Sequence, residues 1–172
     1  MVTGQLQKET LTYISKSAEE TQRSGERLGT LLQGGELILF EGTLGTGKTT
    51  FTQGIARGLG ITTNISSPTF TLLKEYPGQP REASGGKKGP ALYHFDLYRL
   101  DDPEEIFDLG FDDYFYGSGV CVVEWAGNAQ GHWPTECLYI RLSVLGETER
   151  ELAFTAIGER YRELLQQFKK SI

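Results

Sequence analysis

Cysteine and histidine are scarce in this sequence, and their scarcity excludes several classes of site. The 172 residues include two cysteines, Cys121 and Cys137, each within an apolar stretch and without a C-x-x-C spacing. We therefore expect two buried, free thiols rather than a disulfide framework or a zinc site. The two histidines, His94 and His132, lack partners at ligand spacing. We interpret both as structural.

Positive charge is also in deficit. Lys and Arg number 17 against 23 Asp and Glu, which gives a net charge of −6. This balance argues against a broad nucleic-acid surface, while it leaves room for a local basic patch. No stretch approaches the length of a membrane span, and residues 1–9 contain no apolar secretory core, so we expect neither a membrane segment nor a leader. The sequence also lacks the Asn-Lys-x-Asp stretch that reads guanine in GTPases and the arginine-rich lid typical of small-molecule kinases.

Glycine is plentiful, and its most informative cluster is at residues 42–49, which read G-T-L-G-T-G-K-T. This stretch fits the phosphate-loop pattern G-x-x-x-x-G-K-[ST]. Its glycines permit positive φ, so that successive backbone N–H groups can converge on phosphate oxygens. Lys48 would then reach the β- and γ-phosphates, and the Thr49 hydroxyl would contact Mg²⁺. The residues expected to bind the nucleotide here are Gly42, Gly45, Thr46, Gly47, Lys48, Thr49 and Thr50.

Two apolar stretches later in the chain end in an acidic residue. Residues 120–124, Val-Cys-Val-Val-Glu, are typical of a parallel strand buried on both faces. A carboxylate at the end of such a strand, here Glu124, is the second, Mg²⁺-supporting motif of phosphate-loop ATPases. Asp96 ends residues 92–96 in the same way. We expect both acids beside the phosphate loop, with Glu124 more rigid and closer to the metal, and Asp96 orienting water or coupling to a partner.

The remaining patterns predict a single α/β domain over residues 1–172, with a P-loop NTPase-like mixed sheet flanked by helices. Parallel strands are expected at 37–41 and 120–124, and a helix at 48–59 should follow the phosphate loop. The other expected strands are at 11–14, 69–76, 92–96, 138–144 and 151–156. Of these, 69–76 and 92–96 are expected to pair as one antiparallel hairpin, and 138–144 and 151–156 as another. The other expected helices run from a Ser17 capping box to about residue 32, from 101–105 to before Gly110, at 112–115 and at 160–168.

Two segments have more than one interpretation. Residues 64–72, which include Thr69, form either a switch that senses the γ-phosphate or a solvated turn. Residues 77–90 are expected to form a flexible hairpin excursion. Arg81, Lys87 and Lys88 give this excursion positive charge, which suits RNA or an acidic partner, although a solvated loop is the favoured interpretation.

Several short segments of the sequence resemble the motifs of one family. They are G-T-L-G-T-G-K-T-T at 42–50, S-P-T-F-T at 67–71, Y-H-F-D-L-Y-R at 93–99, D-P-E-E at 102–105 and V-E-W at 123–125. Together they resemble the TsaE family (older name YjeE), small bacterial ATPases of tRNA threonylcarbamoyladenosine synthesis, from about Ser17 to the strand at Leu152. The resemblance implies a cytoplasmic protein that uses ATP and Mg²⁺. It also implies action with the TsaB–TsaD pair and contact with tRNA only through that complex, with no membrane or DNA partner.

The resemblance also implies roles for individual residues. Lys48 and Thr49 match phosphate and Mg²⁺ residues, Glu124 matches the second magnesium-side carboxylate, and Asp96 matches the other acid needed for activity. Thr69 falls in the switch-like segment. The residues implied to lie near the nucleotide base are Ser17, Thr21, Trp125 and Arg150. The sequence departs from the family at Thr43, where Asp is usual, at Thr46, where Ala is usual, and at 126–128, after Glu-Trp.

Three functions from different classes remain open at this point. The first is a partner-activated ATPase of tRNA modification. The second is a phosphate-loop small-molecule kinase, and the third is a non-hydrolytic, nucleotide-gated binding module. Phosphate release measured with and without the TsaB–TsaD pair separates the first from the third.

Overall fold

The computed structural model describes residues 7–42, 45–68, 72–98, 100–102, 104–108, 110–124 and 133–172, with the backbone alone at 106 and 107. The strands are β1 (Lys8–Ser15), β2 (Leu37–Glu41), β3 (Leu73–Tyr76), β4 (Leu92–Asp96), β5 (Val120–Glu124), β6 (Cys137–Val144) and β7 (Arg150–Ile157). The helices are α1 (Ala18–Leu31), α2 (Lys48–Gly58), α3 (Glu105–Asp108), α4 (Phe111–Phe115) and α5 (Glu159–Ser171), and a 3-10 turn covers Glu82–Ser84.

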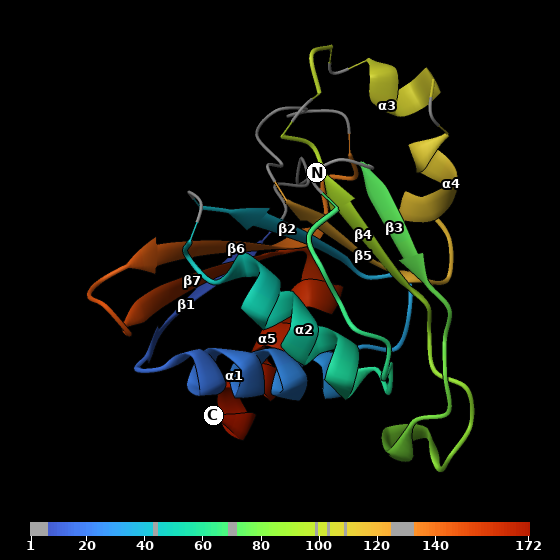
Figure 1. The fold of residues 1–172 in the computed structure, drawn as a ribbon. Helices are drawn as coiled ribbons and strands as arrows, with labels where there is room; N and C mark the ends of the chain where they lie inside the picture. The colour runs from blue at the N-terminus through green and yellow to red at the C-terminus, as the bar shows by residue number, and fades with distance from the viewer. Residues whose placement is uncertain are drawn as a thin grey trace, which may run out of the picture.

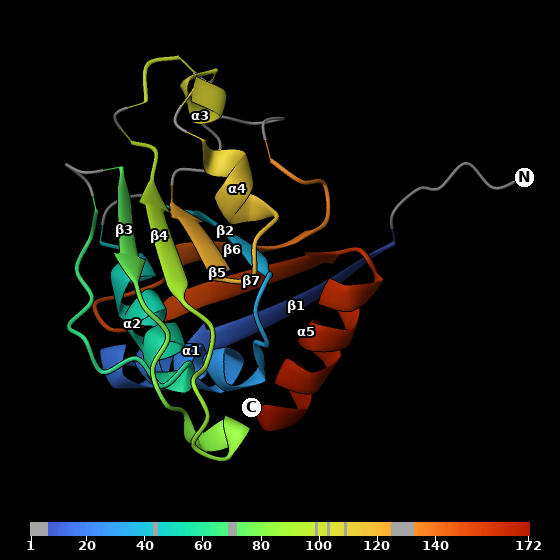
Figure 2. The ribbon, with the colours of Figure 1, turned by 90° about the vertical axis from the view of Figure 1, so that its right-hand side faces the viewer.

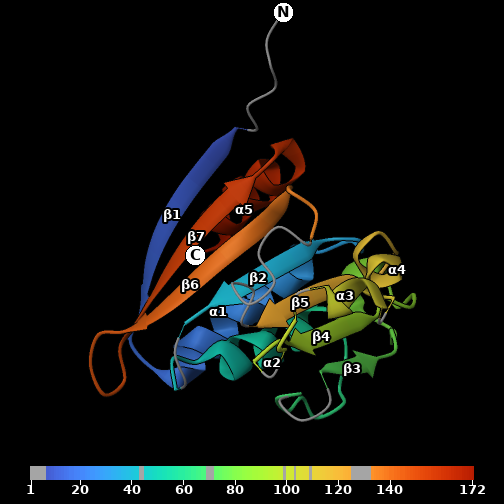
Figure 3. The same cartoon turned by 90° about the horizontal axis from the view of Figure 1, so that it is seen from above.

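All the strands belong to one mixed sheet with the order β1-β7-β6-β2-β5-β4-β3 (Figure 3). The centre is parallel: β2 pairs with both β5 and β6, and β5 also pairs with β4. Antiparallel pairs β6–β7, β7–β1 and β3–β4 complete the sheet on its two sides. The predicted α/β class, the parallel pair β2–β5 and both hairpins are confirmed.

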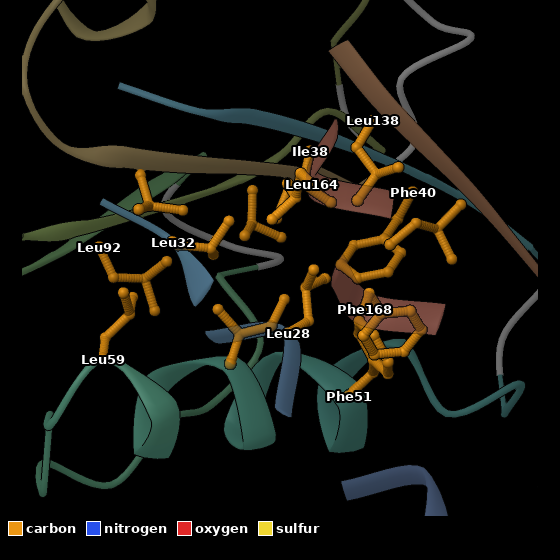
Figure 4. Close-up of a cluster of buried hydrophobic side chains, with 14 of the residues drawn as sticks. Leu28, Leu32, Ile38, Phe40, Phe51, Leu59, Leu92, Leu138, Leu164 and Phe168 are labelled. Atoms are coloured by element: carbon orange, nitrogen blue, oxygen red, sulfur yellow. The ribbon is translucent and has the colours of Figure 1, made fainter. Parts of the chain in front are cut away.

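Helices cover the sheet from both sides. Helices α1, α2 and α5 lie below the sheet in Figure 2, while α3 and α4 lie above it near β4 and β5 (Figure 1). The larger apolar core lies between the sheet and helices α1, α2 and α5, as Figure 4 shows for Phe40, Phe51 and Phe168. A smaller core around Phe95, Phe111 and Cys121 lies beneath α3 and α4. The apolar stretches of β2 and β5 are explained by this double cover, because their side chains are buried on both faces.

Glycines bring α1 and α2 unusually close together. A Cβ at Gly54 would lie 2.0 Å from the Gln22 carbonyl oxygen, and one at Gly25 would lie 2.2 Å from the Phe51 carbonyl oxygen. Gly29 and Gly58 make equally close approaches one turn further along each helix. Because α2 begins at the phosphate loop, this contact sets where that loop lies relative to α1.

One residue of the segment 77–90, Arg81, is not solvated as predicted. The segment forms a hairpin-like excursion with a bridge between Pro80 and Lys88, but Arg81 is only 3% exposed. The Arg81 guanidinium donates to the carbonyls of Gly29, Thr30, Leu32 and Gly58 at 2.7–3.2 Å. The interpretation of Arg81 as part of a positive surface is therefore wrong. It satisfies the carbonyl groups that helices leave unpaired at their C-terminal ends.

The two cysteines are free and buried, as predicted. Burial raises the pKa of the Cys121 thiol to about 12 and that of Cys137 to about 11, so both stay protonated at neutral pH. Within the described part of the chain, none of the helices combines the length and the apolar character needed to cross a membrane.

Candidate functional site

The phosphate-loop pattern folds as a strand, a glycine turn and a helix. Gly42 follows β2, and Gly47 caps α2. Gly42, Gly45 and Gly47 all have positive φ, at 151°, 80° and 102°, a conformation that L side chains avoid. Since Gly47 has no side chain, the N-terminal turn of α2 carries no side-chain cap, and the helix dipole places partial positive charge at this end. This geometry suits an anion.

A cavity of about 550 Å³ opens directly above this turn. Its volume falls in the range of small-molecule sites. It is lined by Ala18, Thr21, Gly45, Thr46, Gly47, Lys48, Thr49, Thr50, Ser67, Asp96, Tyr98, Glu124, Glu147, Thr148 and Arg150. The structure therefore gathers most of the predicted site residues around one space, although Gly42 and Ser17 are not in its lining.

Lys48 is the buried cation of this cavity, with 5% of its surface exposed. Its Nζ donates to the Gly42 carbonyl oxygen at 2.7 Å, which holds the side chain back over the loop. Burial lowers the pKa of Lys48, while the nearby charges of Glu124 and Asp96 act in the opposite direction and raise it. A phosphate group that entered the cavity would add negative charge beside Lys48 and favour its charged form.

The two acids meet as predicted. Asp96 and Glu124 are partners in register at the ends of the parallel strands β4 and β5, on the edge where the phosphate loop lies. They are almost equally buried, with 2% and 3% of their surface exposed. The backbone N–H of Tyr98 donates to Asp96 Oδ1 at 3.0 Å, and the Ser67 hydroxyl lies 3.4 Å from Oδ2.

Glu124 has a different partner, His94. The His94 ring is fully buried, and its Nε2 lies 2.5 Å from Glu124 Oε2. This contact was not predicted from the sequence, because His94 lacks a ligand-spaced neighbour in the chain. The available signal was its place in the β4 stretch, two residues before Asp96 and on the same face of the strand.

The far walls of the cavity come from α1 and from the β6–β7 turn. Ser17 caps α1 by accepting from the Glu20 N–H at 3.1 Å, as predicted. Thr21 is buried, hydrogen-bonds with Ser15 at 2.6 Å and lines the cavity. Arg150 donates to the turn carbonyls of Gly146 and Glu149, each at 2.9 Å, and to Gly45 in the loop at 3.3 Å.

Some predicted residues lie outside the part of the chain that the structure describes. These are Thr43, Thr69, Arg99, Trp125 and His132. Conversely, the cavity contains side chains that motif analysis did not assign to the nucleotide: Ala18, Ser67, Tyr98, Glu147 and Thr148. Ser67 and Tyr98 belong to the quoted segments 67–71 and 93–99, and Ser67 also lies in the candidate γ-phosphate switch at 64–72.

The donor set fits a magnesium ion that shares its shell with phosphate. Among the described residues there is no cluster of three His, Cys, Asp or Glu side chains suited to hold a metal ion by themselves. Mg²⁺ at nucleotide sites does not require one, because it is held by one or two protein oxygens together with phosphates and water. Thr49, Glu124 and Asp96 supply such oxygens around the same cavity.

Comparison with known proteins matches residues 15–152 to the family described as threonylcarbamoyl adenosine biosynthesis protein TsaE. The chain is similar to the tRNA threonylcarbamoyladenosine biosynthesis protein TsaE of Bacillus subtilis, with 42% identity over 160 residues, 93% of this chain and 94% of that protein. It is similar to the protein of that name from Treponema pallidum, with 42% identity over 139 residues, 81% of this chain and 96% of the other. Among solved structures it is similar to the crystal structure of Bacillus subtilis YdiB, with a TM-score of 0.79, 37% identity and coverage of 96% and 97% of the two chains.

Proposed function

This chain belongs to the TsaE family of tRNA threonylcarbamoyladenosine biosynthesis, and we propose that it is the ATP-binding and ATP-hydrolysing component of that machinery. In this proposal it acts in the cytoplasm with homologues of TsaB and TsaD and meets tRNA only through their complex. The observation that supports it best is the convergence of the glycine turn, Lys48, Thr49 and two carboxylates on one cavity. A positive loop that faces two acids suits a phosphate tail together with a divalent cation.

Each side chain then has a defined task. The α2 N-terminus and the loop N–H groups bind the phosphate tail, and the Lys48 ammonium moves from the Gly42 carbonyl to the β- and γ-phosphates. Thr49 and Glu124 would hold Mg²⁺, which when bound neutralises charge on the phosphate oxygens. Asp96 orients the attacking water or transmits the nucleotide state through Ser67 and the backbone of Tyr98.

Adenine is the base that we expect at the far wall. Thr21, Thr148 and Arg150 lie there, beyond the phosphate loop. A guanine-reading Asn-Lys-x-Asp stretch does not occur in the sequence. We therefore expect the protein to prefer ATP over GTP.

Calorimetric titration with Mg–ATP tests the binding part of this proposal. Lys48→Ala should weaken ATP binding about 10- to 100-fold, since a hydrogen bond to a charged group contributes about 1.5–3 kcal/mol. Lys87→Ala is the matched control, because it removes an exposed ammonium in the hairpin excursion, away from the cavity lining. If Lys48→Ala bound ATP as tightly as the Lys87→Ala protein, the assignment of the site would be wrong.

A further inference from the structure

His94 is a buried polar ring next to apolar side chains of the sheet. It lies on β4 with none of its surface exposed, in register with Val122 of β5 and two residues after Leu92. Leu92 and Val122 are equally buried and belong to the core beneath the sheet. A buried polar ring is unfavourable unless it is hydrogen-bonded, and an apolar side chain would fill this position at lower cost. The position therefore needs a reason other than packing.

Among the described residues the ring has one polar partner, and that partner lines the candidate nucleotide site. Nε2 lies 2.5 Å from Glu124 Oε2, whereas Nδ1 has no hydrogen-bond partner among the described residues. An ionised carboxylate can only accept hydrogen bonds, so when Glu124 is ionised, Nε2 is the donor to Oε2. Oε2 of Glu124 is thus hydrogen-bonded to His94, while Glu124 also lines the cavity.

We propose that His94 is a positioning residue that holds Glu124 by Oε2 and thereby leaves Oε1 turned toward the magnesium shell of the bound nucleotide. This inference rests on the proposed function. Ligand carboxylates at metal sites are commonly oriented by hydrogen bonds from behind, and loss of such a bond costs about 10- to 100-fold in metal affinity. The same bond holds Glu124 against the attraction of Lys48, whose ammonium is needed for the phosphate tail.

A matched pair of amide variants tests this role. His94→Gln places an amide N–H near the former Nε2 position, whereas His94→Asn carries the same amide but is too short to reach Glu124. For each protein the dissociation constant of ATP is measured by calorimetry with Mg²⁺ and with EDTA. The ratio of the two constants is the magnesium enhancement. Leu92→Val is the control, because it disturbs the same strand face at a residue without a polar contact to Glu124.

The expected result is that His94→Asn loses about 10- to 100-fold of the magnesium enhancement. His94→Gln and Leu92→Val should keep most of it, and all variants should bind ATP alike in EDTA. In a Glu124→Ala background, His94→Asn should cause no further loss. If circular dichroism shows that His94→Asn does not fold, it is replaced by His94→Phe, which retains the bulk of the ring.

Two results with the variants would overturn the inference. One is a full magnesium enhancement in a folded His94→Asn or His94→Phe protein. The other is an equal loss in the Asn and Gln variants, which would indicate a role in packing alone. A wild-type protein that binds ATP without any magnesium enhancement would also overturn it, while it would leave nucleotide binding intact. A wild-type protein that binds no ATP would instead refute the proposed function itself.

Discussion

Lys48, Asp96 and Glu124 bring one positive and two negative side chains into a nearly solvent-free cluster. Burial of charge is unfavourable unless the charges compensate one another, and here the two carboxylates offset the desolvation of the ammonium only in part. A cation and a phosphate tail would extend this compensation. The cluster is thus an arrangement that a bound Mg–nucleotide would complete.

The different partners of the two acids predict different phenotypes. Glu124, held by His94, should support Mg²⁺, so Glu124→Ala should lower Mg²⁺-dependent ATP affinity. Asp96 contacts Ser67 and the Tyr98 backbone, so Asp96→Ala should leave ATP affinity largely intact and remove phosphate release in the presence of the partners. The paired measurement is Mg–ATP affinity and phosphate release for each variant. Loss of affinity in Asp96→Ala with retention in Glu124→Ala would reverse the two roles.

Local sequence predicted the groups that follow recognisable motifs, and it failed where a contact crosses strands. Lys48, Thr49 and Glu124 stand at fixed places in a loop or at a strand end, so pattern and mechanism identify them together. The His94–Glu124 contact depends on the parallel register of β4 with β5. That strand register cannot be predicted from a single sequence.

At the scale of elements, the helix that carries Lys48 is positioned by its contact with α1. The glycines of this contact recur four residues apart in both helices, at 25 and 29 and at 54 and 58. This spacing places them on one side of each helix, so that the two backbones can approach. The spacing was visible in the sequence, but nothing in a single helix shows which partner its small residues will face.

Gly54→Ala should therefore destabilise the protein even though alanine favours helix more than glycine does. Its Cβ would meet the Gln22 carbonyl oxygen at 2.0 Å, which forces the helices apart. We expect a loss of about 1–3 kcal/mol in the free energy of unfolding measured with urea. Gly146→Ala is the matched control, because no described atom lies within 4 Å of a Cβ there. An unchanged or increased stability of Gly54→Ala would contradict the proposed close packing.

Arg81 provides a second link between elements, from the hairpin excursion to the ends of α1 and α2. Arg81→Met should keep much of the apolar stem but leave buried carbonyl groups without their donor. We expect a loss of about 1–3 kcal/mol in the free energy of unfolding. Lys87→Met, an exposed neighbour in the same excursion, should change it by less than about 0.5 kcal/mol. Equal stability of the two variants would show that these bonds contribute nothing.

The contrast between Arg81 and Lys87 shows that amino-acid composition does not predict which side chain of a loop is buried. Residues 77–90 read as a polar, glycine-rich loop, and nothing in that stretch distinguishes the buried arginine from its exposed lysine neighbours. The distinction arises because the excursion folds back over the carbonyl ends of two helices that are distant in the chain.

In the molecule as a whole, the candidate site lies at the ends of the central parallel strands of the sheet. The parallel strands β4 and β5 contribute the acids, β2 leads into the phosphate loop, and the β6–β7 turn supplies the far wall with Thr148 and Arg150. The hairpins and the pair β2–β5 were predictable from alternation and burial. The parallel pairing of β6 with β2, which brings the turn to the cavity, is a long-range contact that local pattern does not predict.

The β6–β7 turn and the segment that carries Ser67 each form part of the cavity lining. A partner that contacts either segment would change the nucleotide environment without entering the cavity. We therefore expect slow ATP turnover by the protein alone and faster turnover with its partners.

The proposed ATPase function is tested by phosphate release from Mg–ATP, measured with the protein alone and after addition of TsaB and TsaD homologues. We expect low release by the isolated protein, a marked increase with the partners, and loss of that increase in Lys48→Ala. Reactions with the partners alone set the background. Release that never exceeds this background, from a protein that binds ATP, would contradict the proposal and indicate a nucleotide-gated binding module instead.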